Sequence, residues 1–182
     1  MSMHAIRFIN TLGLLGITTV LLTGFCLQLT LHELPCPLCL LQRAGFTLLM
    51  FGFMLNVLEG SRPRHYAIIL FAALFGCAVA LRQILLHVIP GTPPYGSAVW
   101  HYHYYSWSFI IFFSSILACA VLLFLADTTL SPEQKQLPPS PFTSFCCWLA
   151  IATTAANAVA AFIECGLHAC PPNPAHYWLF SN

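Results

Sequence analysis

Two cysteines that are close in sequence, Cys36 and Cys39, lie in the run Glu33-Leu-Pro-Cys-Pro-Leu-Cys-Leu-Leu-Gln-Arg43, where one apolar stretch ends and the next begins. A Cys-X-X-Cys pair can close a small disulfide, and the free N–H groups and dipole of a helix N-terminus stabilise a thiolate, which is the reactive form. Pro35 and Pro37 favour a helix start, because proline needs no N–H partner in the first turn. We therefore expect thiol–disulfide chemistry at a helix that begins within about two residues of Pro37.

A second pair, Cys165 and Cys170, follows the last apolar stretch in the tail Glu164-Cys-Gly-Leu-His-Ala-Cys-Pro. A thiolate of one pair can attack the disulfide of another through a mixed-disulfide intermediate, which passes two electrons between the pairs. Such a relay requires both cysteine pairs to lie close together in the folded protein. Their positions depend on the elements between them.

Composition identifies the setting of the chain as a lipid bilayer. Hydrophobic residues make up 59% of the 182 residues and charged residues only 6%, whereas soluble domains carry roughly 25% charged residues. The formal net charge of +1 provides no basic field for phosphates, which argues against a nucleic-acid partner. The chain is expected to be an integral membrane protein.

Apolar stretches long enough to cross a bilayer as helices divide the sequence. They run roughly from Phe8 to Leu31, Leu40 to Leu58, Tyr66 to Ile89, Ser106 to Ala126 and Phe145 to Ile163. The first is longer than the apolar region of a signal peptide and is expected to stay in the membrane. The predicted fold class is an all-α integral membrane protein, a four-helix transmembrane bundle plus a fifth transmembrane helix.

The distribution of Lys and Arg predicts the orientation of these helices. Arg7, Arg62, Arg64 and Lys135 fall in the N-terminal segment and in alternate connections, which places these segments in the cytoplasm by the positive-inside rule. The opposite loops, over residues 32–37 and 90–105, contain no Lys or Arg. Five spans then put the C-terminal tail outside, so both cysteine pairs are expected to face an oxidising compartment.

We divide the chain into three parts. Residues 1–126 form the predicted four-helix redox core, and residues 127–144, with Ser-Pro and Pro-Pro steps, form a cytoplasmic linker. Residues 145–182 form the fifth helix and the outward-facing cysteine tail. The small residues of the fifth helix, Ala-Thr-Thr-Ala-Ala-Asn-Ala-Val-Ala-Ala, favour close packing against the bundle.

The stretch Pro-Cys-Pro-Leu-Cys-Leu-Leu-Gln-Arg, the later Arg82-Gln83 step and the Pro90-Gly91 step that ends the third span resemble the disulfide bond formation protein B (DsbB) family. The resemblance covers about four of the five predicted spans. It implies a bacterial inner-membrane protein with a bound quinone, either ubiquinone or menaquinone, drawn from the membrane quinone pool. By this resemblance Cys39 faces the quinone ring and Arg43 helps to hold it.

The chain departs from the best-known members of that family, which carry a second cysteine pair in the loop between the third and fourth helices. The corresponding loop here, residues 90–105, contains no cysteine. We therefore expect Cys165 and Cys170 to take over that role. A reduced thioredoxin-fold protein of the periplasm would reduce the tail pair, which would then reduce Cys36/Cys39, and Cys39 would pass electrons to the quinone.

Histidines suggest two further hypotheses. His87, near the outer end of the third span, is predicted to hydrogen-bond a quinone carbonyl or to move a proton. His101 and His103 lie in an aromatic-rich loop of the kind found at membrane interfaces, and two histidines supply too few ligands for a closed metal site. We expect no metal.

Two other functions remain open on sequence grounds. The outer cysteines could be structural staples of a non-enzymatic assembly or chaperone subunit, and redox lability would separate staples from a relay. The chain could also be a quinone-reducing relative of the vitamin K epoxide reductases, which share a four-helix core, but no motif in the sequence supports this. The other five cysteines are predicted to be small apolar packing residues; they are Cys26, Cys77, Cys119, Cys146 and Cys147.

Overall fold

The computed structural model describes residues 3–93, 95–125, 139–174 and 176–180. Its long helices are α1 (Met3–Leu31), α2 (Pro37–Leu58), α3 (Pro63–Val88), α4 (Tyr104–Leu125) and α5 (Pro141–Cys165). All five are long and apolar enough to cross a membrane, so the predicted fold class, an all-α membrane protein with five spanning helices, is confirmed. Two short strands, β1 (Ala98–Val99) and β2 (Tyr102–His103), and a 3₁₀ turn η1 (Trp178–Phe180) complete the described elements.

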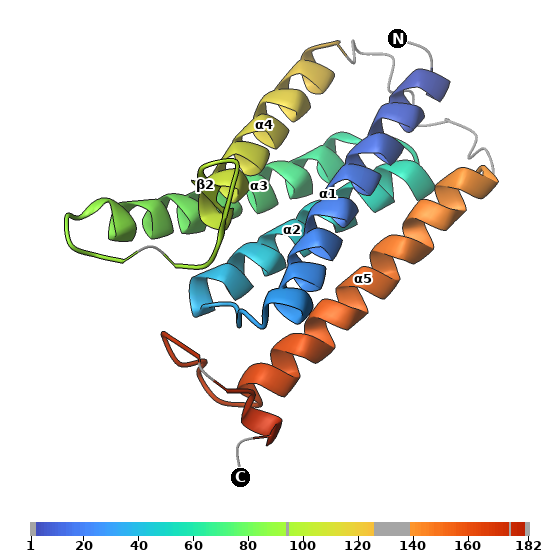
Figure 1. Ribbon diagram of the computed structural model, residues 1–182. Helices are drawn as coiled ribbons and strands as arrows, with labels where there is room; N and C mark the ends of the chain where they lie inside the picture. The colour runs from blue at the N-terminus through green and yellow to red at the C-terminus, as the bar shows by residue number, and fades with distance from the viewer. Residues whose placement is uncertain (1–2, 94, 126–138, 175, 181–182) are drawn as a thin grey trace.

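The helices alternate in direction, and the first four pack side by side in chain order. α2 contacts α1 and α3, and α3 contacts α4, while α5 lies mainly along α1 and touches α2 near its outer end. Figure 1 shows that the α1–α2 connection, the β1–β2 hairpin and the C-terminal tail all lie at one end of the bundle. We call it the outer end, and the opposite one the inner end.

Several helices extend beyond the apolar stretches predicted from the sequence: α1 begins at Met3 rather than Phe8, and α3 at Pro63 rather than Tyr66. α2 begins at Pro37 as predicted, with Cys36 as its N-cap. α5, however, begins at Pro141 rather than Phe145, because the Ser140 side chain accepts a hydrogen bond from the Thr143 N–H and caps the helix. At its other end α5 continues past Ile163 to Cys165. Most of the predicted linker, residues 127–144, lies outside the described residues.

A glycine contact brings α2, α3 and α4 close together about two helical turns inward from the cysteine pair. The rings of Phe46 and Phe112 stack with centroids 4.0 Å apart. A Cβ atom added to Gly76 would lie 2.3 Å from the Phe112 ring, so this approach requires glycine. The stacked rings fix the position of Phe46, which forms one wall of the site described below.

The inner end is held by a buried polar network that joins three helices. The Asn56 amide donates to Asn10 Oδ1 at 2.9 Å, and the Asn10 amide donates to the Tyr66 hydroxyl at 3.0 Å. Asn56 Oδ1 accepts from the Arg62 backbone N–H at 3.3 Å and lies 3.2 Å from His65 Nδ1. Every side-chain polar atom of the two asparagines therefore has a partner, and the network ties α1 to α2 and α3.

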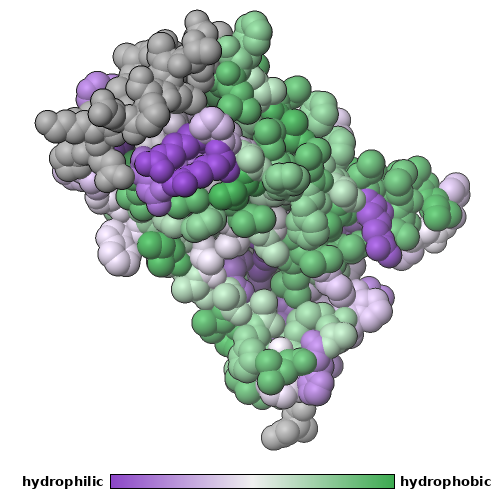
Figure 2. All heavy atoms as spheres, turned by 180° about the vertical axis from the view of Figure 1, so that it is seen from behind, coloured by the Kyte–Doolittle hydropathy of each residue, from purple (hydrophilic) through white to green (hydrophobic). Residues whose placement is uncertain are grey.

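The outward surface of the helices is apolar, as a lipid-facing surface must be. Figure 2 shows hydrophobic side chains over most of one face, with the largest hydrophilic patch beside the grey residues at one end. Phe71, Phe124 and Trp148 are among the most exposed large side chains. Of the cysteines expected to pack in the interior, Cys119, Cys146 and Cys147 are buried, whereas Cys26 is exposed on α1.

Candidate active site

The cysteine pair lies at the first turn of α2. Cys36 Sγ accepts a hydrogen bond from the Cys39 backbone N–H at 3.2 Å, and both residues are free thiols. Cys36 is buried, whereas Cys39 is half-buried. The side-chain hydrogen bond with Cys39, reinforced by burial, raises the pKa of the Cys36 thiol above its usual value. Cys36 therefore stays protonated at neutral pH while the pair is reduced.

Gln83 of α3 joins the two sulfur atoms. Its Nε2 lies 3.4 Å from Cys36 Sγ and 3.5 Å from Cys39 Sγ. The Gln42 amide donates to Gln83 Oε1 at 2.7 Å, which turns the Gln83 amide nitrogen toward the sulfurs. Sequence reasoning missed both glutamines. Both stand in the segments that carry the family resemblance, Gln42 directly before Arg43 and Gln83 directly after the exposed Arg82, but neither was given a role there.

Arg43 lies one helical turn after Cys39 and is held from two other helices. Its Nη1 donates to Gln28 Oε1 of α1 at 2.7 Å and to Asn157 Oδ1 of α5 at 3.2 Å. Its Nη2 donates to the Gly24 carbonyl at 3.3 Å. These acceptors are all neutral, so the hydrogen bonds leave the positive charge of the guanidinium available to stabilise negative charge at Cys39 or in the adjacent pocket.

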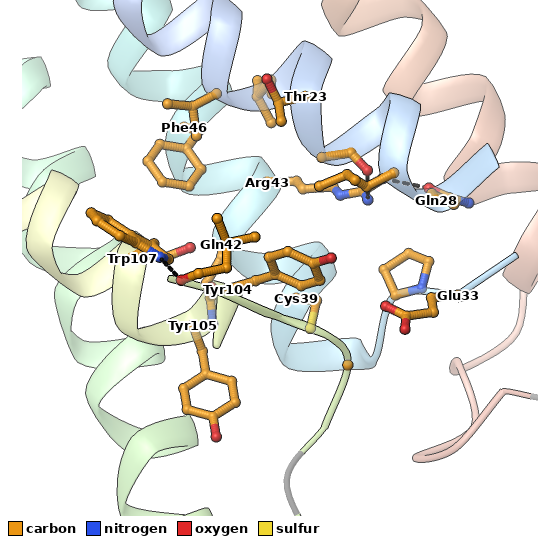
Figure 3. Close-up of a pocket in the computed structure, with 18 of the residues that line it drawn as sticks. Thr23, Gln28, Glu33, Cys39, Gln42, Arg43, Phe46, Tyr104, Tyr105 and Trp107 are labelled. Atoms are coloured by element: carbon orange, nitrogen blue, oxygen red, sulfur yellow. Dashed lines mark hydrogen bonds between the residues drawn. The ribbon is translucent and has the colours of Figure 1, made fainter. Parts of the chain in front are cut away.

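A pocket of about 310 Å³ opens beside Cys39. Its walls come from all of α1 to α4 and from the loops at the outer end, and they include Thr23, Gln28, Cys39, Arg43, Phe46 and Trp107. Figure 3 shows Gln28 and Arg43 toward one end of the pocket and the rings of Phe46 and Trp107 toward the other. The lining is predominantly apolar, with a few polar groups, as is typical of small-molecule sites.

One of those polar groups has an unused donor. Gln28 is buried and uses its Oε1 to accept from Arg43, but its Nε2 has no hydrogen-bond partner. Leaving a buried amide donor unpaired costs about 1–3 kcal/mol. A ligand with an acceptor oxygen in this pocket would recover that cost.

The loop between α3 and α4 closes the pocket from the outer end. The Tyr95 hydroxyl donates to the Leu34 carbonyl at 2.7 Å, and the Ser97 N–H donates to Glu33 Oε2 at 3.1 Å. Burial raises the pKa of Tyr95, which keeps the phenol protonated. These two hydrogen bonds therefore hold the loop against the α1–α2 connection that carries Cys36.

His87, predicted to contact the quinone, is not among the residues that line the pocket. Its Nδ1 lies 2.7 Å from the Gln83 carbonyl, and its ring stacks on Tyr105 at a centroid distance of 5.2 Å. Tyr105 does line the pocket. A role of His87 toward a ligand stays a prediction.

The second cysteine pair forms a disulfide, Cys165–Cys170, at the end of α5. The chain turns at Gly166, whose φ of 61° favours glycine, and a Cβ there would lie 2.7 Å from the Trp178 ring. Trp178 also packs edge-to-face on Phe162 with centroids 6.3 Å apart. The tail is thus folded back on α5 at the outer end, where the α1–α2 connection also lies (Figure 1).

The geometry places three of the predicted residues, Cys36, Cys39 and Arg43, together around Gln83 and the pocket. It brings the tail pair to the same end of the bundle, where Cys165 bonds to Cys170 and not to Cys36 or Cys39. Residues from α1, α3 and α5 that the sequence did not single out complete the arrangement. Their contribution depends on tertiary contacts.

Comparison with known proteins identifies the same region. The family model described as "Disulfide bond formation protein DsbB" matches residues 6–96, half of the chain. Disulfide bond formation protein B of Xanthomonas euvesicatoria pv. vesicatoria is 34% identical over 84 residues, which are 43% of this chain and 49% of that protein. The protein of the same name from Aromatoleum aromaticum is 36% identical over 84 residues, 43% of this chain and 51% of its own length.

The match therefore spans about half the length of these curated relatives. No solved structure matches the chain. The region of the family model contains α1, α2 and α3, and with them the cysteine pair, Arg43 and Gln83. The chain belongs to the DsbB family of disulfide bond formation proteins.

Proposed function

We propose that this protein is a membrane thiol oxidase, which reoxidises a thioredoxin-fold dithiol protein of the periplasm and passes the electrons to a membrane quinone through two cysteine pairs. The observation that carries the proposal is the pocket, because it brings a thiol of the Cys36/Cys39 pair, the Arg43 guanidinium and an apolar wall into one cavity. Family membership supports disulfide chemistry. The route of the electrons is our inference.

The residues present fit a quinone. A quinone headgroup is a flat ring with carbonyl acceptors, and it would lie against Phe46 while Arg43 and the unpaired Gln28 Nε2 supply donors. A bound quinone supplies a two-electron, two-proton acceptor, a chemistry that protein side chains lack. Ubiquinone and menaquinone share this headgroup chemistry, and the residues fit either.

The chain's own cysteines would carry the electrons in two exchanges. A thiolate of the partner attacks the Cys165–Cys170 disulfide, and its second thiol resolves the mixed disulfide, so the partner is oxidised and the tail pair is reduced. A tail thiolate then attacks a Cys36–Cys39 disulfide in the same way.

Arg43 and Gln83 would then prepare the reduced pair for reoxidation. The positive charge of Arg43 stabilises a thiolate at Cys39, and in a low-dielectric site such an interaction is stronger than in water. The Gln83 amide donates to whichever sulfur carries the charge. Cys36, kept protonated by its raised pKa, supplies the proton of the second thiol when the disulfide closes.

We infer that the protein is a multi-pass protein of the bacterial inner membrane, with its N-terminus in the cytoplasm and its C-terminus in the periplasm. Five alternating helices support this topology, because they place the two ends of the chain on opposite sides. Arg62 and Arg64 at the inner end and the loops free of Lys and Arg at the outer end agree with the positive-inside rule.

The test is anaerobic reduction of a soluble quinone analogue by the purified protein in detergent, with a reduced thioredoxin-fold donor. Wild type is compared with C36S/C39S, with C165S/C170S and with C26S, a control that removes an exposed cysteine of α1. We expect both double variants to lose donor-driven turnover while C26S keeps it. If only C36S/C39S is inactive, the tail disulfide is a structural staple; if wild type is inactive, the oxidase proposal is wrong.

A further inference from the structure

Glu164 is a buried carboxylic acid that the proposed relay does not use. It lies in the last turn of α5, next to Cys165, with only 2% of its surface exposed. Neither carboxyl oxygen has a hydrogen-bond partner. A buried, unpartnered carboxylate is costly unless a nearby positive charge compensates it, so this residue needs a physical explanation.

The helix register brings Glu164 to the depth of the cysteine pair. α2 and α5 run in opposite directions, and the hydrogen bond between Arg43 Nη1 and Asn157 Oδ1, 3.2 Å long, aligns them. From Arg43 the α2 helix rises about 6 Å outward to Cys39, and from Asn157 the α5 helix rises about 10 Å outward to Glu164. Glu164 and Cys39 are thus neighbours in depth, and Coulomb interactions link Glu164 with both Arg43 and Cys39.

Arg43 is the charge that Glu164 can balance. Among the described residues no carboxylate lies within 4.0 Å of Arg43, and the ion pairs found there involve only Glu59. The charged or titratable groups that interact with Glu164 are Arg43 and Cys39 of α2 and Tyr95 of the outer loop, and Tyr177 of the tail acts on Arg43. Two anions, a Cys39 thiolate and the Glu164 carboxylate, therefore compete for a single cation.

We propose that Glu164 is a charge-balancing proton acceptor, which is ionised while Cys36 and Cys39 are oxidised and becomes protonated when Cys39 becomes a thiolate. In that step the S–H bond of Cys39 breaks, an O–H bond forms on Glu164, and no electrons move. The net charge of the site stays constant, which avoids the cost of adding a charge inside a membrane protein. Glu164 releases the proton when the pair closes its disulfide again.

This inference rests on the proposed function only for the redox cycle of Cys36/Cys39. Neither carboxyl oxygen of Glu164 is hydrogen-bonded to a sulfur, so Glu164 takes up the proton without a direct hydrogen bond to Cys39 and compensates charge through Arg43. Because α5 lies outside the matched residues 6–96, the proton acceptor belongs to the part of the chain that the family model does not cover. The fifth helix then contributes to the charge balance of the Cys36/Cys39 pair as well as carrying the tail cysteines.

The experiment is infrared difference spectroscopy of the full chain in detergent, reduced with dithiothreitol minus oxidised. We expect a carboxylic-acid carbonyl band to appear in wild type, to vanish in E164Q and to shift in E164D. E59Q is the matched control, because Glu59 is a partly exposed carboxylate at the inner end, and it should leave the band unchanged. C39S should remove the band although the tail disulfide can still be reduced, which ties the proton to Cys39.

Turnover supplies a second, separate readout. E164Q should lower kcat for the quinone analogue about tenfold, less than the loss of a direct acid–base group, with little change in KM. A band that persists in E164Q, or that is absent from wild type, overturns the inference. If wild type fails to reduce the quinone analogue but shows the Glu164 band, the oxidase proposal fails while the inference stands.

Discussion

The inner and outer ends of the bundle both contain buried polar side chains, but they use them differently. At the inner end, Asn10 and Asn56 have a partner for every side-chain polar atom. At the outer end, Gln28 keeps an unpaired amide nitrogen and Glu164 two unpaired carboxyl oxygens. The inner network is complete within the chain, whereas the outer one is incomplete without a ligand or a proton.

This contrast separates stability from function in a membrane bundle. A fully satisfied network fixes how helices cross and gains nothing from a ligand. An incomplete network costs folding free energy, and such groups concentrate where a protein binds or reacts. Substitutions at the inner end should therefore change stability, and those at the outer end should change catalysis.

The largest expected effect is at the outer end, in Arg43→Ala. Loss of the guanidinium removes the charge that stabilises a Cys39 thiolate and a donor that lines the pocket, so kcat for quinone reduction should fall about 100-fold. Stopped-flow or steady-state reduction of a quinone analogue measures it. Unchanged quinone reduction together with slowed thiol exchange would show that Arg43 acts elsewhere.

The matching change at the inner end is Asn56→Ala. It leaves Asn10 Oδ1 and the Arg62 N–H without partners, and the free energy of unfolding should fall by about 1–3 kcal/mol. Thermal unfolding in detergent measures this loss. Turnover at a temperature where the variant stays folded should equal that of wild type; a selective loss of turnover would break the contrast between the two ends.

Gln83→Met tests the donor shared by the two sulfurs. Methionine keeps the length of the side chain but cannot donate to Cys36 or Cys39, so kcat should fall about tenfold, the effect of one charge-assisted hydrogen bond. The thermal midpoint should change less than in Asn56→Ala. Equal loss of stability in the two variants would mean that Gln83 is a packing residue.

Tyr95→Phe should have the smallest effect. It removes the hydrogen bond to the Leu34 carbonyl that holds the outer loop in place. A single neutral hydrogen bond of this kind contributes about 1 kcal/mol to the stability of the closed loop. We expect a rise in KM for the quinone analogue of about fivefold or less, with kcat preserved. A change in kcat larger than in KM would indicate that the loop does more than close the pocket.

Much of the fold could be predicted from the sequence, because the signals are local. Five apolar stretches predict five spanning helices, and Pro37 places the start of α2. The start of α5 was misplaced because Phe145 was taken as the first apolar residue, whereas the Ser140 cap and Pro141 begin the helix earlier. Hydropathy detects the membrane-spanning part of a helix and not its capped ends.

The site was less predictable. Cys36, Cys39 and Arg43 share a short motif, so sequence spacing placed them together. Gln28 and Asn157 each lie far from that motif in sequence, and their relevance depends on a contact with Arg43 that only the folded bundle creates. An uncharged amide in an apolar stretch carries no local signal that distinguishes a ligand-facing position from a buried packing position.

The attachment of the second cysteine pair has a kinetic consequence. Cys165 is the last residue of α5, so one sulfur of the tail is fixed to the end of a helix that packs on α1 and α2. Encounter between the two pairs of the chain is then intramolecular, with an effective concentration on the order of millimolar. Electron transfer between them should be independent of protein concentration, and the second-order step should be the meeting with the soluble partner.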